Sequence, residues 1–113
     1  MRLRTLAMRL SKLHPHPCHS IELEQYSTEG DLAARWLSDV AAFGDLFRGC
    51  SVVDIGSGNG VLGLGALLMG ASSATLVEVD EEASAVSAGN AADLGLEECI
   101  EIVRAEVSED ALD

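Results

Sequence analysis

A glycine-rich run between a β-branched segment and an apolar segment constrains this chain most. Gly56, Gly58 and Gly60 follow residues 51–55, which are rich in valine and isoleucine, and they precede the apolar residues 61–69. Glycines at such a junction permit positive φ angles and a close approach of a ligand to the main chain. The N-terminus of the helix that follows offers free N–H groups. The sequence therefore predicts a strand, a ligand-binding turn and a helix, in that order.

Strand and helix signals alternate after residue 50. Such alternation, with strands that are almost continuously apolar, is typical of a parallel sheet with helical crossovers. Because the chain ends ten residues after the third strand signal, we expect one half of a doubly wound α/β sheet. The expected strands are 51–55, 75–79 and 100–103, and the expected helices are 61–69, closed by Gly70, and 81–94, closed by Gly95.

The first 48 residues predict a helical cap that precedes this α/β unit, which spans 49–113. Apolar residues recur at helical spacing between Leu3 and Leu13, and Pro15 and Pro17 end that first helix. The stripe that we expect it to bury consists of Leu3, Leu6, Ala7, Leu10 and Leu13.

A second helix is expected to follow, with Ser27 or Thr28 as its N-cap. Its apolar residues are spaced as one face of a helix, and Gly44 then weakens the helix. We expect a buried stripe of Leu32, Trp36 and Val40, with Ala33 and Leu37 beside it, and continued packing by Phe43, Leu46 and Phe47.

Charge is distributed unevenly along the chain. Nineteen acidic residues oppose seven basic ones, and the formal net charge is −12. Four of the bases precede the first acid, Glu22, and the rest of the chain repels nucleic acid phosphates unless salt screens it. Few lysines and many carboxylates favour a protein from a high-salt cytoplasm over an ordinary acidic bacterial protein. The early bases are Arg2, Arg4, Arg9 and Lys12.

The sequence also indicates where the protein is found. Arg9 and Lys12 interrupt the apolar stretch that a signal peptide would need. No apolar run approaches the roughly 20 residues of a membrane span. Cys18, Cys50 and Cys99 are odd in number and share no CxxC spacing, which argues against a disulfide framework or a zinc knuckle. We therefore expect a cytoplasmic protein.

A run of metal-ligand side chains extends from His14 to His19. Pro15 and Pro17 stiffen this run as a polyproline-like chain, which spreads the side chains apart. We expect a solvated connector there and no metal site.

Carboxylates follow the second predicted strand. Glu78 and Asp80 lie at its end, next to the glycine run in a parallel sheet, where a carboxylate can accept two hydrogen bonds from a ribose diol. Gly58, Gly60 and Gly63 also satisfy a GxGxxG pattern, with Glu78 twenty residues beyond Gly58, as a dinucleotide site would need. Asp54 argues against a pyrophosphate, because it would repel that anion but attract an ammonium or a sulfonium. The residues thus point to a nucleoside-bearing cofactor.

The segment from Asp54 to Gly60, followed by Leu-Val-Glu78-Val-Asp80, resembles motifs I and II of class I S-adenosylmethionine-dependent methyltransferases. The resemblance implies the N-terminal half of a Rossmann-like fold and S-adenosyl-L-methionine as cofactor. Asn90 is similar to an asparagine common in that family. The cofactor-binding residues that the resemblance implies are Asp54, Gly56, Gly58, Gly60, Glu78, Asp80, Glu106 opposite the adenine amino group, and the Val107 main chain beside the ring.

A segment upstream resembles a narrower branch. Leu23-Glu24-Gln25-Tyr26-Ser27-Thr28 is similar to the LEQYPT element of the methyltransferase-like protein five branch, whose archaeal and eukaryotic members methylate N6 of an adenosine in small-subunit rRNA. The resemblance places Gln25 and Thr28 over the cofactor. Ser27 replaces the proline of that element, which loosens the turn. A simple helix cap is the alternative interpretation of this segment.

The chain lacks the Asn-Pro-Pro-Phe loop that holds the flipped adenine in such enzymes, since its only prolines are Pro15 and Pro17. We therefore expect no catalytic residue here, and little or no turnover by this chain alone. The resemblance implies an rRNA substrate for the full-length enzyme and a small zinc-containing activator subunit at a sheet edge. The alternatives are a fragment of an NAD-dependent oxidoreductase, a non-catalytic nucleotide-binding module, and a methyltransferase that acts on a protein or a small molecule.

Overall fold

The computed structural model describes residues 1–15 and 26–105, and side chains over 1–15 and 30–105. Gln25, Glu106 and Val107 lie outside the described residues, as do His16 and Cys18 of the histidine-rich run. Four α-helices, a short 3₁₀ helix and three strands follow one another in the described part. These are α1 (Leu3–Ser11), α2 (Tyr26–Ala42), β1 (Ser51–Ile55), α3 (Val61–Leu68), β2 (Ser73–Val77), α4 (Glu81–Asp93), η2 (Glu97–Cys99) and β3 (Ile100–Val103).

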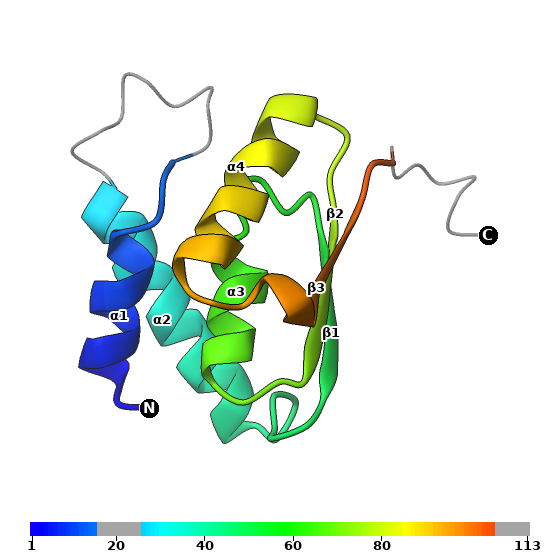
Figure 1. The fold of residues 1–113 in the computed structure, drawn as a ribbon. Coiled ribbons are helices and arrows are strands. Elements are labelled where there is room, and N and C mark those ends of the chain that lie inside the picture. The colour runs from blue at the N-terminus through cyan, green and yellow to red at the C-terminus, as the bar shows by residue number, and fades with distance from the viewer. Residues whose placement is uncertain (16–25, 106–113) are drawn as a thin grey trace.

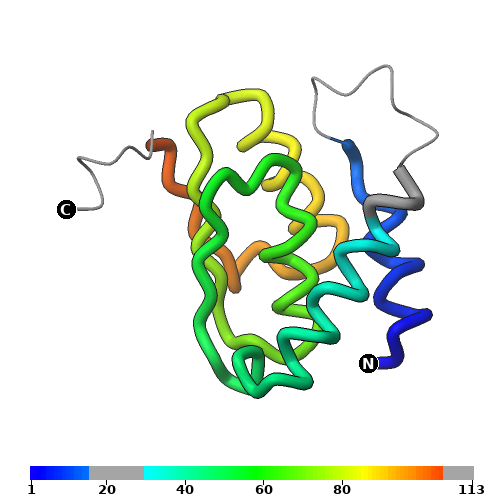
Figure 2. Tube along the Cα trace, turned by 180° about the vertical axis from the view of Figure 1, so that it is seen from behind, coloured from blue at the N-terminus to red at the C-terminus, as the bar shows by residue number. Residues whose placement is uncertain are grey.

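The three strands form a parallel sheet in the order β1-β2-β3. Asp54 on β1 is the register partner of Leu76 on β2, and Leu76 is the partner of Ile102 on β3. Figure 1 shows the helices on one side of this sheet, with α3 between the sheet and the pair α1 and α2. Figure 2 shows α1 and β3 at opposite sides of the molecule. This order of strands and helices is the α/β arrangement that the sequence predicts.

The core lies between the sheet and the helical pair. Leu6 and Leu10 of α1 pack in one buried cluster with Leu37 of α2, Leu64 of α3 and Leu76 of β2. Glycine permits the closest of these helix contacts, because a Cβ on Gly65 of α3 would overlap the side chain of Leu37 and lie 3.1 Å from that of Leu10. The early helices thus share one core with the sheet.

The predicted stripe of α2 is wrong at two positions. Leu32 and Trp36 are exposed, Trp36 to 57%, whereas Ala33, Ala34 and Leu37 are buried. The reason is the close packing of α2 against α1 and α3, which needs small side chains on the shared face. A Cβ on Gly30 would overlap Ser11 of α1, so no larger residue fits at that position of the shared face.

Other local predictions also need correction. Phe43 is 84% exposed and Phe47 is exposed as well, while Leu46 is buried as expected. Leu3 is exposed, although Leu6 and Leu10 of the same stripe are buried. No element among the described residues covers these side chains. Some boundaries differ. The helix α2 begins at Tyr26, so neither Ser27 nor Thr28 is its N-cap. The strand β2 begins and ends two residues earlier than predicted, and α3 and α4 each end one residue earlier.

One face of the sheet and one edge of β1 are uncovered in the described part of the chain. Val53 is 65% exposed, and Ile55 and Val79 on the same face are exposed too. A groove of about 180 Å³ runs beside β1 and is lined by residues that include Trp36, Val40, Leu46, Val52, Asp54 and Leu62. The described part of the sheet therefore leaves apolar surface open. Among the described residues, no helix has both the length and the apolarity to span a membrane.

Candidate cofactor site

The glycine run forms a tight loop between β1 and α3. The N–H groups of Gly56 and Ser57 both donate to the carbonyl of Val77, at 2.8 and 3.1 Å, so the loop begins as an extension of the sheet. Gly56, Gly58 and Gly60 have φ angles of 72°, 57° and 86°. Residues that carry a side chain rarely adopt such φ angles, so the loop requires these glycines. It brings the exposed Gly56 to the carboxyl end of β1.

Glu78 holds this loop from the end of the neighbouring strand. Its Oε1 accepts a hydrogen bond from the Gly58 N–H at 2.7 Å, and its Oε2 accepts one from the Asp80 N–H at 3.1 Å. The residue is 9% exposed. Glu78 is therefore placed to orient the loop, and it lies at the end of the second strand, where a carboxylate bonds a ribose diol in a Rossmann-like site.

Asp54 lies between β1 and the start of α3. Its Oδ2 accepts a hydrogen bond from the Gly63 N–H at 3.2 Å. Burial raises the pKa of the Asp54 carboxyl above its usual value, the Gly63 N–H partly opposes this, and the negative charge of Glu78 adds to the rise in pKa. A cation placed near these two carboxylates would be attracted by both.

The other predicted residues are distributed differently. Asp80 caps α4, because its Oδ1 accepts a hydrogen bond from the Glu82 N–H at 3.3 Å. Thr28 lies in the first turn of α2, and its side chain falls outside the described residues, as Gln25, Glu106 and Val107 do entirely. The structure thus brings together Asp54, Gly56, Gly58, Gly60, Glu78 and Asp80.

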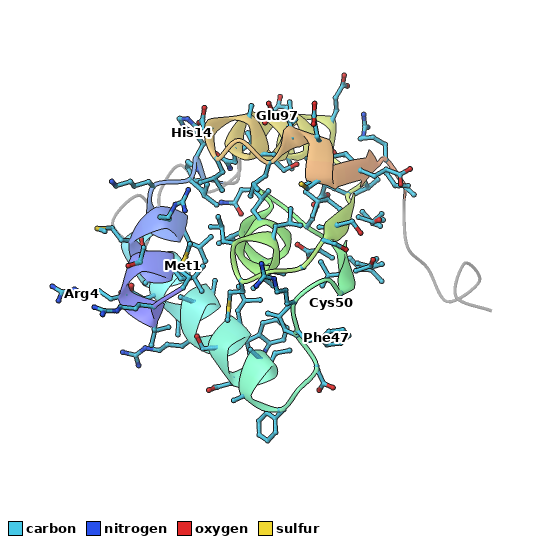
Figure 3. All side chains as sticks on the ribbon, turned by 60° about the horizontal axis from the view of Figure 1, so that its bottom comes forward. Met1, Arg4, His14, Phe47, Cys50 and Glu97 are labelled. Atoms are coloured by element: carbon cyan, nitrogen blue, oxygen red, sulfur yellow. The ribbon has the colours of Figure 1, made fainter. Side chains whose placement is uncertain are left out.

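Two asparagines are a part of this site that sequence reasoning did not assign. Asn59, inside the glycine loop, donates from Nδ2 to the His14 carbonyl at 2.9 Å. Asn90 of α4 accepts from the His14 N–H at 2.8 Å. Figure 3 shows His14 beside α4. The only signal in the sequence was the similarity of Asn90 to a family asparagine, and nothing in it marked Asn59 or His14 as partners.

The residues present fit a nucleoside cofactor that carries a cation. A Cβ on Gly56 would meet no atom within 4 Å, so a ligand can approach the main chain there. Glu78 lies at the end of β2, where its carboxylate is placed to bond a ribose diol. The half-buried Asp54 favours a positively charged group near it. A pyrophosphate would be repelled by these carboxylates, which favours a methionyl group over a dinucleotide.

Relatives of known or suspected activity share this region. Residues 30–113 match the sequence model of the family described as ribosomal protein L11 methyltransferase (PrmA). The ribosomal protein L11 methyltransferase of Xanthomonas campestris is 47% identical over 60 residues, which are 53% of this chain and 19% of that protein. An uncharacterised protein of Methanocaldococcus jannaschii is 35% identical over 92 residues, 81% of this chain and 41% of that protein.

Solved structures show the same arrangement over more of the chain. A candidate RNA methyltransferase from Pyrococcus horikoshii is 38% identical with a TM-score of 0.74, over 91% of this chain and 50% of that one. Protein 1320 of Thermoplasma acidophilum is 30% identical with a TM-score of 0.71, over 95% of this chain and 47% of that one. The chain therefore spans no more than half the length of these relatives. From the extent of the family match, the chain belongs to the PrmA methyltransferase family.

Proposed function

We propose that this chain is the cofactor-binding half of an S-adenosylmethionine-dependent methyltransferase. The observation that carries the proposal is the joining of the glycine loop to the end of β2 by Glu78, through the 2.7 Å hydrogen bond from Gly58. Family membership supports it and argues against a nicotinamide-dependent oxidoreductase. The half-length match to the relatives supports the view that acceptor-binding residues are not among these 113.

Each residue of the site has a role in this proposal. S-adenosylmethionine would supply an electrophilic methyl group, whose carbon would be attacked by an acceptor lone pair as its bond to sulfur breaks, with S-adenosylhomocysteine as the leaving group. Glu78 accepts hydrogen bonds from the ribose hydroxyls, and the loop from Gly56 to Gly60 lets the cofactor approach the main chain. Asp54 attracts the methionyl ammonium. Gln25 and Thr28 cover the cofactor, and Asp80, Glu106 and the Val107 main chain contribute from the ends of β2 and β3.

For the acceptor, we propose N6 of an adenosine in small-subunit rRNA. The similarity to the Pyrococcus candidate RNA methyltransferase over most of the chain supports an RNA acceptor. The Gln25-containing element and the four bases near the N-terminus support it further. The adenine-binding loop is not in this sequence, so we propose that turnover needs further polypeptide. A small zinc-containing activator at a sheet edge is part of the same proposal.

A ribosomal protein is the second candidate acceptor. The observation that favours it is the family match together with the Xanthomonas relative, whose name gives ribosomal protein L11 as its acceptor. The match to that relative covers 53% of this chain and 19% of that protein.

Calorimetry with S-adenosylhomocysteine and with NAD tests the cofactor. Binding of S-adenosylhomocysteine alone is the expected result, and binding of NAD alone would reject the proposal. The coding DNA beyond codon 113 tests the acceptor. An open frame that encodes an Asn-Pro-Pro-Phe loop or a close variant is expected, whereas an open frame without such a loop would reject adenine N6 in favour of another acceptor.

A further inference from the structure

The main chain at His14 is held by two asparagine side chains from distant parts of the sequence. Asn90 is fully buried on α4, and Asn59 is 6% exposed within the glycine loop. The His14 carbonyl accepts hydrogen bonds from both side-chain amides, at 2.9 Å from Asn59 and 3.1 Å from Asn90. The His14 N–H donates to Asn90 Oδ1 at 2.8 Å. Both main-chain polar groups of His14, which follows α1, are therefore hydrogen-bonded to asparagine side chains.

The same two side chains also fix the glycine loop. Asn59 Oδ1 accepts the Val61 N–H at 3.2 Å, at the first residue of α3. Asn90 Nδ2 donates to the Asn59 carbonyl at 3.0 Å, which orients a peptide group inside the loop. Each asparagine thus bonds the loop with one group and His14 with another. We call Asn59, Asn90 and the His14 main chain the asparagine clamp.

The clamp is the polar link between α1 and the site. The buried side chains Leu6 and Leu10 of α1 belong to the apolar core with Leu37 and Leu64. If α1 moved away, two buried amides would lose the His14 carbonyl as acceptor, and buried polar groups without partners are unfavourable. The loop would then lose part of what holds its shape.

From this geometry we propose that the asparagine clamp couples the docking of α1 to the binding of the nucleoside cofactor in the glycine loop. Asn59 and Asn90 are positioning residues, because they act through the loop and through His14. The coupling is reciprocal, so cofactor binding also stabilises the docked α1. This inference rests on the proposed function, since it takes the glycine loop as the cofactor site.

Amide hydrogen exchange with and without S-adenosylhomocysteine tests the coupling. If α1 undocks only after the ligand has left, exchange of the α1 amides slows by roughly 100-fold at a ligand concentration of 100 Kd. The α3 amides serve as the reference within the same molecule. If the asparagine clamp does not couple α1 to the cofactor site, S-adenosylhomocysteine will leave the exchange rate of the α1 amides unchanged.

Three variants make the test specific. Asn59→Asp keeps the acceptor for the Val61 N–H and loses the donor to His14, and Asn90→Leu removes all three hydrogen bonds of that side chain. Ser87→Ala is the matched control, because Ser87 is also fully buried on α4 but its hydroxyl donates to the Ser84 carbonyl within the helix. The expected result is that ligand slows α3 exchange in all variants but slows α1 exchange only in the wild type and in Ser87→Ala.

The outcomes separate the two proposals. Failure of the wild type to bind S-adenosylhomocysteine would overturn the proposed function, and this inference with it. Binding without slower α1 exchange in the wild type, or an undiminished α1 response in Asn59→Asp, would overturn the coupling alone. Asn59→Asp decides the matter if Asn90→Leu does not fold.

Discussion

Replacement of Glu78 by glutamine tests the site at its centre. The carboxylate accepts hydrogen bonds at both oxygens, from the N–H of Gly58 at 2.7 Å and from that of Asp80 at 3.1 Å. An amide has a single oxygen, so its Nε2 would face one of these N–H groups as a second donor. A hydrogen bond to a charged group is worth about 1.5–3 kcal/mol, and we expect the free energy of unfolding to fall by an amount in that range.

The free energy of ligand binding is expected to weaken by a similar amount in Glu78→Gln. If a ribose diol bonds both oxygens of Glu78, the amide retains one of the two acceptors. The loss of about 1.5–3 kcal/mol then raises the Kd for S-adenosylhomocysteine by roughly 10- to 150-fold. Titration calorimetry measures this change, and urea unfolding of the same samples shows that the variant is folded under the assay conditions.

Glu81→Gln is the matched control for charge. Glu81 is exposed in the first turn of α4, three residues from Glu78. Its carboxylate favours the helix N-terminus by about 0.3–1 kcal/mol, so only a small change in stability is expected and none in affinity. A folded Glu78→Gln that binds S-adenosylhomocysteine as tightly as the wild type would show that Glu78 does not hold the ribose. Equal losses in both variants would show that overall charge decides the affinity.

Three further changes test other parts of the structure. Burial raises the pKa of the Asp54 carboxyl, so the folded chain holds that proton more tightly than the unfolded chain, and the free energy of unfolding falls as pH rises through this pKa. Urea unfolding should therefore show that Asp54→Asn gains stability relative to the wild type between pH 4 and pH 7. The absence of such a gain would contradict the raised pKa. Gly60→Ala should lose about 1–2 kcal/mol of stability, because φ is 86° there and a Cβ would lie 3.1 Å from that of Ser87, whereas Gly89→Ala in open space should not. The exposed sheet face around Val53 is expected to make the chain self-associate, so Val53→Lys should lower self-association as measured by sedimentation velocity. Equal association of the variant and the wild type would show that this face is not the contact between copies.

The order of strands and helices was predictable because local signals specify it. β-branched runs identify β1 and β3 within the predicted bounds, and Gly70 and Gly95, with φ angles of 116° and 71°, end the helices that precede them. The pairing of Glu78 with the glycine run also followed, since the carboxyl ends of parallel strands meet at one edge of a sheet. These inferences need only the neighbours along the chain and one rule of topology.

Some predictions of burial were wrong, because burial depends on which elements pack against a helix. The apolar character of Trp36 indicates that burial would be favourable, but it does not say which side of α2 meets another element. Small residues on the opposite side let α1 and α3 come close, and Trp36 was left facing the groove beside β1. The contacts of Asn59 and Asn90 with His14 span 45 and 76 residues and involve main-chain groups. No local pattern encodes such contacts.

Asp54 connects the stability of the fold with its use. A carboxylate that is partly buried near Glu78 is unfavourable in the folded chain, which the raised pKa of Asp54 reflects. A cationic ligand would favour the ionised form of the same group, so its binding releases a proton at a pH below that raised pKa. The affinity for S-adenosylhomocysteine should then increase as pH rises through this range, and Asp54→Asn should abolish the increase. A site built in this way gains stability from its ligand at a carboxylate whose ionisation the fold alone disfavours.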